Sequence, residues 1–278
     1  MLQEMGVKVW LPKTSVVKEV SILDPTPDPT MPKADAPLSV PLPKAALPAA
    51  LTTEKSNSTP RTTTAKPIVL HNLNCGQLGW AELQTAVQSC RACGLCEGRH
   101  QAVFGAGQAA TEQAQAPQVD WLIVGEAPGE QEDRVGEPFV GPAGQLLDNM
   151  LKAMQLNRSQ AVYLTNAIKC HPPHNRNPSD EEIAQCSPFL QRQITLLRPK
   201  IIVAMGRFAV NALLQNTVAD VQKVPLGKLR GQVHYYGHEG CTIPVIASYH
   251  PAYLLRNLSE KAKSWADLCL AMETYRAL

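Results

Sequence analysis

The first 67 residues of this 278-residue chain have little of what builds a folded core. They contain one glycine and one aromatic residue, but eleven of the 23 prolines. Such a segment buries too little apolar surface to offset the backbone entropy lost on folding. We therefore predict a Pro/Thr/Ala-rich disordered tail or linker over 1–74 and one folded domain over 75–278. The apolar stretch at 1–13 is either a docking segment for a protein partner or a disordered end.

Long apolar runs are also missing. None approaches the roughly 20 residues of a membrane-spanning helix, and the N-terminus lacks the basic-then-apolar order of a secretory signal. We therefore expect a cytoplasmic protein without a membrane partner. Separately, we expect it to act as a monomer. Cysteines stay reduced in that compartment, so metal or cluster ligation explains the eight cysteines better than four disulfides do.

An excess of one charge is absent from the predicted domain. Residues 1–74 carry eight Lys/Arg and six Asp/Glu, a net charge of +2, whereas residues 75–278 carry eighteen of each and are neutral. This balance gives no sign that the domain binds nucleic acid over its whole surface, so any contact with DNA or RNA needs a local basic patch. The segment 223–263 is the best candidate, with six Lys/Arg against two Asp/Glu.

Short apolar runs alternate with amphipathic segments from residue 121 onward. The alternation predicts an α/β fold, a three-layer sandwich whose central, mainly parallel sheet carries helices on both faces. In such a fold the carboxyl ends of the strands lie together, so the segments GEAPG, TNAIKC and SYHP should converge. The first predicted strand lies in the run 121–129, which ends in a glycine-containing turn, and the others are 161–165, 201–205, 231–236 and 242–248. The predicted helices lie around 146–154, after the cap Ser179, at 206–214 and at 259–276.

Four of the eight cysteines form two pairs. Cys90 and Cys93 are spaced C-x2-C, and Cys170 and Cys186 are spaced C-x15-C, beginning just after a predicted strand. A C-x2-C turn is typical of half a metal or cluster site, and the second pair completes four ligands. Zinc remains an alternative, although its structural sites more often use two compact pairs, so the wide second pair favours an iron–sulfur cluster. Cys96 extends the first pair to C-x2-C-x2-C.

Six motifs occur in the order CRACGLCEGR, VFGAG, GEAPGEQED, PFVGPAGQLL, TNAIKCHPPHNRNP and SYHPAYLL. In this order and spacing, over roughly residues 78–278, they resemble the family 4 uracil-DNA glycosylases. The resemblance implies a uracil-DNA glycosylase fold and a monofunctional hydrolase of base-excision repair, which removes uracil from single- or double-stranded DNA and leaves an abasic site. It also implies a 4Fe-4S cluster held by Cys90, Cys93, Cys170 and Cys186. The family usually has no cysteine at the position of Cys96, which is left out of the ligand set.

Recognition of a flipped-out uracil is assigned by the same resemblance. Asn166, at the end of a predicted strand, would pair through its carboxamide with uracil N3 and O4. Cytosine reverses this pattern at two positions, and each unpaired buried group costs roughly 1–3 kcal/mol. Phe139 would stack on the base. His250 would donate a hydrogen bond to uracil O2, where negative charge develops as the N-glycosidic bond breaks.

The group that activates water is less defined. Where several uracil-glycosylase families place an aspartate, this chain has Ala127, directly after Glu126. Glu126 is therefore the candidate for positioning or activating water, with Ala127 in the pocket lining. Glu132, Asp133 and Asn175 would support Glu126 through hydrogen bonds. A solvated loop is an equally good interpretation of the two carboxylates.

Residues beyond the last motif histidine are predicted to contact DNA. Leu254 and Leu255 would form an apolar wedge that fills the gap left by the flipped base, and Arg256 beside them would contact phosphate. Helix packing is the alternative for the leucines. Arg230 is a predicted phosphate contact from the opposite side.

Two other functions remain open at this point. One is a non-catalytic iron–sulfur module that binds DNA or accompanies a polymerase, with the N-terminal segment as its docking element. It would bind DNA equally well with and without uracil and release no base. The other is a related glycosylase that binds uracil-DNA covalently through an inserted basic loop with a histidine. No such insertion lies between PFVGPAG and QLLDNML, which argues against it.

Overall fold

The computed structural model describes residues 75–108, 119–238 and 241–278, except for the side chains of His238 and Cys241. The predicted tail at 1–74 lies outside these residues and stays a prediction. Within the described part of the chain, no helix is both long and apolar enough to cross a membrane.

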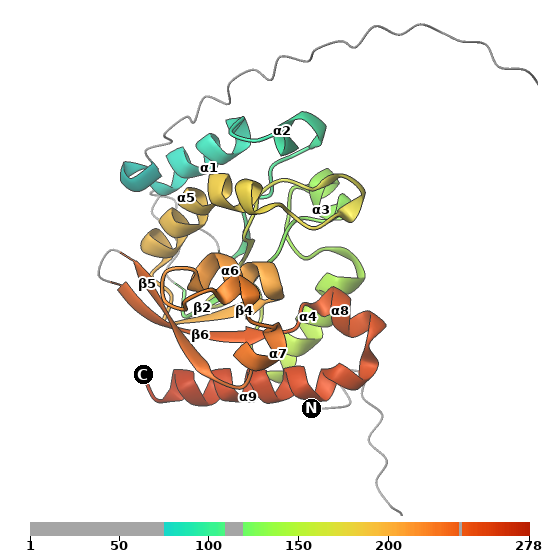
Figure 1. Ribbon diagram of the computed structural model, residues 1–278, viewed down its shortest axis with the longest axis vertical. Coiled ribbons are helices and arrows are strands. Elements are labelled where there is room, and N and C mark those ends of the chain that lie inside the picture. Colours follow the sequence, from blue (N-terminus) through green and yellow to red (C-terminus); the bar gives the residue numbers. More distant parts are fainter. Residues whose placement is uncertain (1–74, 109–118, 239–240) are drawn as a thin grey trace, which may run out of the picture. The chain divides into compact units, whose positions relative to one another are not determined.

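A six-stranded sheet forms the centre of the folded domain, in the order β1-β3-β2-β4-β6-β5 (Figure 1). The four inner strands run parallel, and the edge strands β1 and β5 pair antiparallel to β3 and β6. The predicted mainly parallel sheet is therefore confirmed. The two-residue edge strand β1 was not predicted, because it is too short to leave an apolar pattern. The strands are β1 (Ala106–Gly107), β2 (Trp121–Gly125), β3 (Val162–Asn166), β4 (Ile201–Met205), β5 (Val233–His238) and β6 (Cys241–Ser248).

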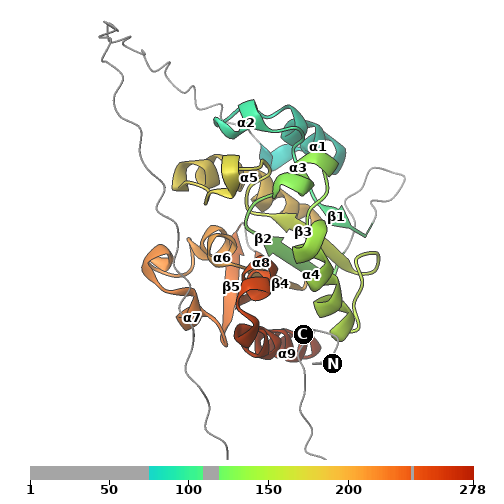
Figure 2. The ribbon, with the colours of Figure 1, turned by 90° about the vertical axis from the view of Figure 1, so that its right-hand side faces the viewer.

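Helices cover both faces of this sheet (Figures 1 and 2). Alternate residues of β2 enter two separate cores: Leu122 and Val124 pack with α1, α5 and α6, whereas Trp121 and Ile123 pack with α4, α8 and α9. This division confirms the predicted three layers. The helices are α1 (Trp80–Ser89), α2 (Leu95–Gly98), α3 (Glu130–Val135), α4 (Gly141–Ala153), α5 (Asp180–Leu197), α6 (Arg207–Leu214), α7 (Leu226–Leu229), α8 (Pro251–Arg256) and α9 (Lys261–Arg276).

The inner strands end at a common edge. Gly125 of β2 pairs with Asn166 of β3, and Met205 of β4 pairs with Ser248 of β6. Each pair stands at the carboxyl end of its strands, so the segments that follow must emerge side by side. The predicted convergence of GEAPG, TNAIKC and SYHP is thus present in the fold, and it creates the crevice in which parallel sheets usually hold ligands.

Candidate active site

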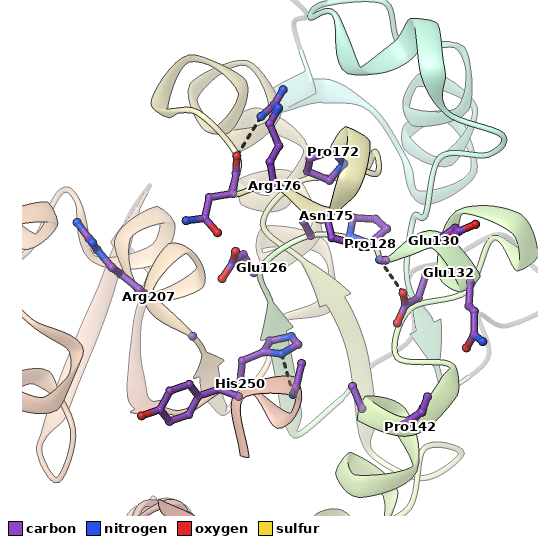
Figure 3. A pocket seen from close by; sticks show the side chains of 18 of the residues that line it. Glu126, Pro128, Glu130, Glu132, Pro142, Pro172, Asn175, Arg176, Arg207 and His250 are labelled. Atoms are coloured by element: carbon purple, nitrogen blue, oxygen red, sulfur yellow. Dashed lines mark hydrogen bonds between the residues drawn. The ribbon is translucent and has the colours of Figure 1, made fainter. Parts of the chain in front are cut away.

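A cleft of about 740 Å³ opens at the carboxyl edge of the sheet. It is bordered by the turn after β2, the loop after β3, the start of α6 and the start of α8. Figure 3 shows the side chains of Glu126 and His250 pointing into this space from different strand ends. Six of the predicted site residues line it: Glu126, Ala127, Glu132, Asn175, His250 and Arg256.

Asn166 and Phe139 do not line this cleft but meet beside it, around the α carbon of Gly125, the residue before Glu126. A Cβ at Gly125 would collide with Asn166 Oδ1 and would lie 2.5 Å from Phe139 Cζ. Only glycine therefore admits both side chains here. The Phe139 and His250 rings stack with their centroids 5.7 Å apart and their planes at 24°. Phe139 lies 27 residues before Asn166, and His250 lies 84 residues after it, yet the three side chains form one connected group.

Glu126 and His250 approach each other at a second glycine. Gly206 has a φ of +95°, and a Cβ there would lie 3.4 Å from Glu126 Oε2 and 3.3 Å from His250 Cβ. The carboxylate and the imidazole therefore both flank this residue, which directly follows β4. Four strand ends contribute to the site, through Gly125, Asn166, Gly206 and His250.

Burial controls the charge of both titratable groups. It raises the pKa of Glu126 to about 7, since no cation or hydrogen-bond donor among the described residues offsets it. Burial, aided by the positive charge of Arg256, lowers the pKa of His250 to about 4. The Ala252 backbone N–H donates to His250 Nδ1 at 3.2 Å. Because Nδ1 accepts, the single proton of the neutral ring lies on Nε2.

The predicted hydrogen bonds from Glu132 and Asp133 to Glu126 are wrong. Glu132 instead accepts from the Gly129 backbone N–H at 2.6 Å and so fixes the turn at the start of α3. Asp133 is 2% exposed and accepts from the His100 backbone N–H at 2.9 Å. Neither carboxylate belongs to a solvated loop, because each binds backbone N–H groups that helix and loop geometry leave unpaired.

Asn175 lines the cleft without a hydrogen bond to Glu126 within the described ranges. Its φ of 53° places it in the left-handed region, which asparagine tolerates better than most residues. The turn that contains it brings Asn175 close to the segment after β2: a Cβ at Gly129 would lie 4.0 Å from Asn175 Oδ1. It therefore shapes the cleft wall rather than holding Glu126.

Two of the predicted DNA contacts are wrong. Leu254 is fully buried in the core beneath α8, so it cannot enter DNA. The Arg230 side chain is 9% exposed, pairs with Asp267 at 2.7 Å and lies over the Tyr249 ring, so it is not free to bind phosphate. Leu255 is 41% exposed and stays a candidate wedge.

Arginines that the sequence did not single out lie at the cleft. Arg207 is exposed and donates to the Gln222 carbonyl oxygen at 2.8 Å, and it lines the cleft together with Arg256. Arg176 lines it too, but it pairs with Glu182 at 2.6 Å. Figure 3 shows Arg207 and Arg176 on separate sides of Glu126. Arg207 lies outside the six motifs, and Arg176 lies within TNAIKCHPPHNRNP but was given no role there.

The predicted cluster ligands lie together next to this site. Cys90, Cys93, Cys170 and Cys186 line a small, mostly apolar pocket, and Cys96 lines it as well. No group of three or more His, Cys, Asp or Glu side chains in the described part of the chain is arranged to hold a single metal ion. The charged side chains that border the pocket indicate separately whether it suits an anionic metal cluster.

Two cations border the cysteine pocket. Arg99 Nη1 donates to Cys170 Sγ at 3.0 Å. Lys169 is 1% exposed, and its Nζ donates to Thr165 Oγ1 at 2.6 Å, to the Asn166 carbonyl oxygen at 2.9 Å and to Gln193 Oε1 at 2.6 Å. No carboxylate pairs with Lys169 in the described ranges; the acidic groups that influence it are the thiols of Cys170 and Cys186.

A buried ammonium needs a compensating negative charge. Four thiolates around a metal cluster carry such a charge, whereas four neutral thiols do not. Lys169 and Arg99 thus match an anionic centre at this position, and the donor set fits the 4Fe-4S cluster that the family resemblance implies. Neither cation was singled out from the sequence.

Comparison with known proteins agrees with this geometry. A family model, the uracil DNA glycosylase superfamily, matches residues 112–270. The chain therefore belongs to the uracil DNA glycosylase superfamily. It is 38% identical over 201 residues to a Type-4 uracil-DNA glycosylase of Sulfurisphaera tokodaii, covering 70% of this chain and 86% of that protein. It is 41% identical over 169 residues to that of Archaeoglobus fulgidus, covering 61% and 79%, and 39% identical over 178 residues to that of Thermotoga maritima, covering 64% and 83%. The resemblance to family 4 is confirmed.

Proposed function

We propose that this protein is a uracil-DNA glycosylase of base-excision repair. It takes a uracil that has been flipped out of DNA and hydrolyses the N-glycosidic bond, leaving an abasic site. The observation that carries the proposal is a chain of contacts: Asn166 and Phe139 meet around Gly125, and Phe139 stacks on His250, which shares the cleft with Glu126. Superfamily membership and the Type-4 relatives support it.

Base selection rests on Asn166 and Phe139, two buried residues beside the cleft. The Asn166 carboxamide accepts from uracil N3–H through Oδ1 and donates to O4 through Nδ2. Asn166 is 3% exposed, so a base with the opposite donor pattern leaves buried groups unpaired. The Phe139 ring provides the flat face on which the base stacks. Cytosine is rejected because its N3 and N4 groups present the reverse pattern.

His250 and Glu126 have separate roles in cleaving the N-glycosidic bond. The electron pair of the C1′–N1 bond moves to uracil, and the Nε2–H of neutral His250 stabilises the charge that develops at O2 by a hydrogen bond. Water attacks C1′ and forms the new C–O bond, while its proton passes to the Glu126 carboxylate. A base with a pKa of about 7 is suited to this step, because it is largely ionised at slightly alkaline pH and still binds a proton well.

Exposed residues at the rim of the cleft contact the DNA. Arg207 and Arg256 are exposed cations on separate helices, so they can neutralise phosphates on both sides of a flipped nucleotide. Leu255 is exposed beside Arg256 and can occupy the space that the base leaves in the stack. This arrangement replaces the predicted contacts at Arg230 and Leu254.

A 4Fe-4S cluster held by Cys90, Cys93, Cys170 and Cys186 completes the proposal. When bound, it would supply a covalent cross-link between the segment before α2 and the β3–α5 region. Asn166 lies four residues before Cys170, so the cross-link would stabilise the strand end that presents the base-reading carboxamide. Cys96 lines the same pocket, and only variants of each cysteine in turn can distinguish it from the four ligands.

The direct test uses single- and double-stranded DNA with one uracil. Wild-type protein that contains its cluster should release uracil and leave alkali-labile abasic sites. Asn166→Ala and His250→Ala should lose most of the rate but keep the brown absorbance of the cluster. His234→Ala, a histidine on β5 outside the cleft lining, is the matched control and should be fully active.

A second outcome would replace the proposal. If the wild-type protein bound DNA equally well with and without uracil and released no base, it would be a non-catalytic DNA-binding module. For the cofactor, replacing any of the four proposed ligands by serine should abolish the absorbance, while Cys96→Ser should retain it. Loss in Cys96→Ser together with retention in Cys186→Ser would overturn the assigned ligand set.

A further inference from the structure

The backbone of Phe139 has an unusual conformation for a bulky residue. Its φ is 55°, in the left-handed region that costs conformational energy for any residue with a Cβ. The ring is nevertheless well placed: it is 3% exposed, contacts the Gly125 region and stacks on His250. A strained residue persists only where its surroundings hold it, so some group must fix this segment.

Arg158 binds this segment directly. Its Nη2 donates to the Phe139 carbonyl oxygen at 2.7 Å, and its Nη1 donates to the Pro138 carbonyl oxygen at 3.2 Å. Its Nε donates to Asp148 Oδ1 at 2.6 Å, which orients the guanidinium from α4. A single planar group therefore binds two consecutive carbonyls and one carboxylate, a geometry for which arginine is suited and lysine is not.

The first turn of α4 is shaped to admit this contact. A Cβ at Gly144 would collide with the Phe139 carbonyl oxygen and would lie 3.3 Å from Arg158 Nη2. The absence of a side chain at Gly144 thus lets the carbonyl and the guanidinium meet. Arg158 itself is 19 residues from Phe139 in the sequence and is not part of the cleft lining.

We propose that Arg158 is a positioning residue for uracil excision, which acts by holding Phe139 in the conformation that stacks on the base. The inference rests on the proposed function, because it assigns to Arg158 a role in that same site. Arg158 touches neither the cleft nor the reacting atoms. Its effect on the rate must therefore pass through the Phe139 ring.

A double-mutant cycle tests this route. Arg158→Met in the wild-type background should lower the single-turnover rate of uracil release by about 10- to 100-fold, because a small displacement of a positioning group has an effect of that size. In a Phe139→Leu background the same substitution should have almost no further effect on the rate. Unfolding by denaturant, measured on all four proteins, should show a similar loss of stability from Arg158→Met in both backgrounds.

Conservative and control variants sharpen the test. Arg158→Lys should be nearly as slow as Arg158→Met, because an ammonium cannot bind both carbonyls and Asp148. Added guanidinium ion should partly restore the rate of Arg158→Ala and leave that of wild type unchanged. Arg134→Met is the matched control, since Arg134 forms an exposed pair with Glu130 at 2.5 Å, and it should leave the rate unchanged.

Opposite results would overturn the inference. An equal loss of rate from Arg158→Met in both backgrounds would show that Arg158 acts on the whole domain rather than through Phe139. If Arg158→Met does not fold, Asp148→Asn, which only releases the orientation of the guanidinium, replaces it in the same cycle with the same criterion. Failure of the proposed function is distinguishable, because then the wild-type protein would release no uracil at all.

Discussion

Glu126→Gln should make this protein more stable at alkaline pH while impairing uracil release. Burial raises the pKa of Glu126 from 4.5 to about 7 in the folded protein. The folded state therefore binds the proton more tightly than the unfolded state, and ionising the carboxyl as the pH rises destabilises the fold. Glutamine keeps a similar shape without the charge and removes this cost.

The size of the effect follows from the shift in pKa. A difference of about 2.5 between the folded and unfolded pKa corresponds to about 3 kcal/mol, at about 1.36 kcal/mol per pKa unit. This cost is nearly complete at pH 8, and it falls below about 1 kcal/mol at pH 5, close to the unfolded pKa. For a domain of about 200 residues, the melting temperature of Glu126→Gln should exceed that of wild type by about 6–12 °C at pH 8.

Thermal unfolding of both proteins at pH 5 and pH 8, with cluster content matched by absorbance, measures the difference. Glu137→Gln, at an exposed glutamate, is the control and should change the melting temperature little at either pH. The single-turnover rate of Glu126→Gln should be strongly reduced at pH 8, where Glu126 of wild type is ionised. If the stability gain were absent, or equal at pH 5 and pH 8, Glu126 would not be a desolvated carboxyl, and its assignment as the base would lose its support.

Three further predictions concern the same site. The rate of uracil release should fall as the pH drops below about 7, following Glu126, with no separate loss near 6.5, because the pKa of His250 is about 4; a pH profile of single-turnover rates checks this. Leu254→Ala should cost about 2–5 kcal/mol of stability in denaturant unfolding, whereas Leu255→Ala should leave stability unchanged and weaken DNA binding. Arg256→Ala should make the slope of log affinity for DNA against log salt concentration less steep, by the amount that corresponds to about one phosphate contact. Arg230→Ala should leave that slope unchanged and destabilise the fold by about 3–5 kcal/mol, since it leaves the buried Asp267 carboxylate without its cation.

The main elements of the fold follow from local pattern. Apolar runs at β2, β3 and β4 are buried on both faces, as inner parallel strands must be. Ser179 caps α5 as predicted, with its Oγ accepting from the Glu182 backbone N–H at 3.2 Å. The edge strand β1 escaped prediction because two residues form no periodic pattern.

The candidate site, like the fold, could be predicted from the sequence only where its residues stand in a local pattern. Residues in strand-end motifs, such as Asn166 and His250, could be found because their position after a strand places them at the common edge of the sheet. Glu132 was found as a site residue, but its role was wrong, since a helix start one turn away binds its carboxylate. Arg158 was missed because the two groups that link it to the site are backbone carbonyl oxygens, which carry no signal in the sequence.

The sequence by itself determined the alternation of strands and helices, the two cysteine pairs and the motifs that end the inner strands, because each is a property of residues close together in the chain. Tertiary structure alone decided which of Leu254 and Leu255 is buried, and that Arg230 binds Asp267, 37 residues away, instead of phosphate. The physical reason is that the exposure and charge of a side chain depend on what packs against it. Here that neighbour comes from a distant part of the chain.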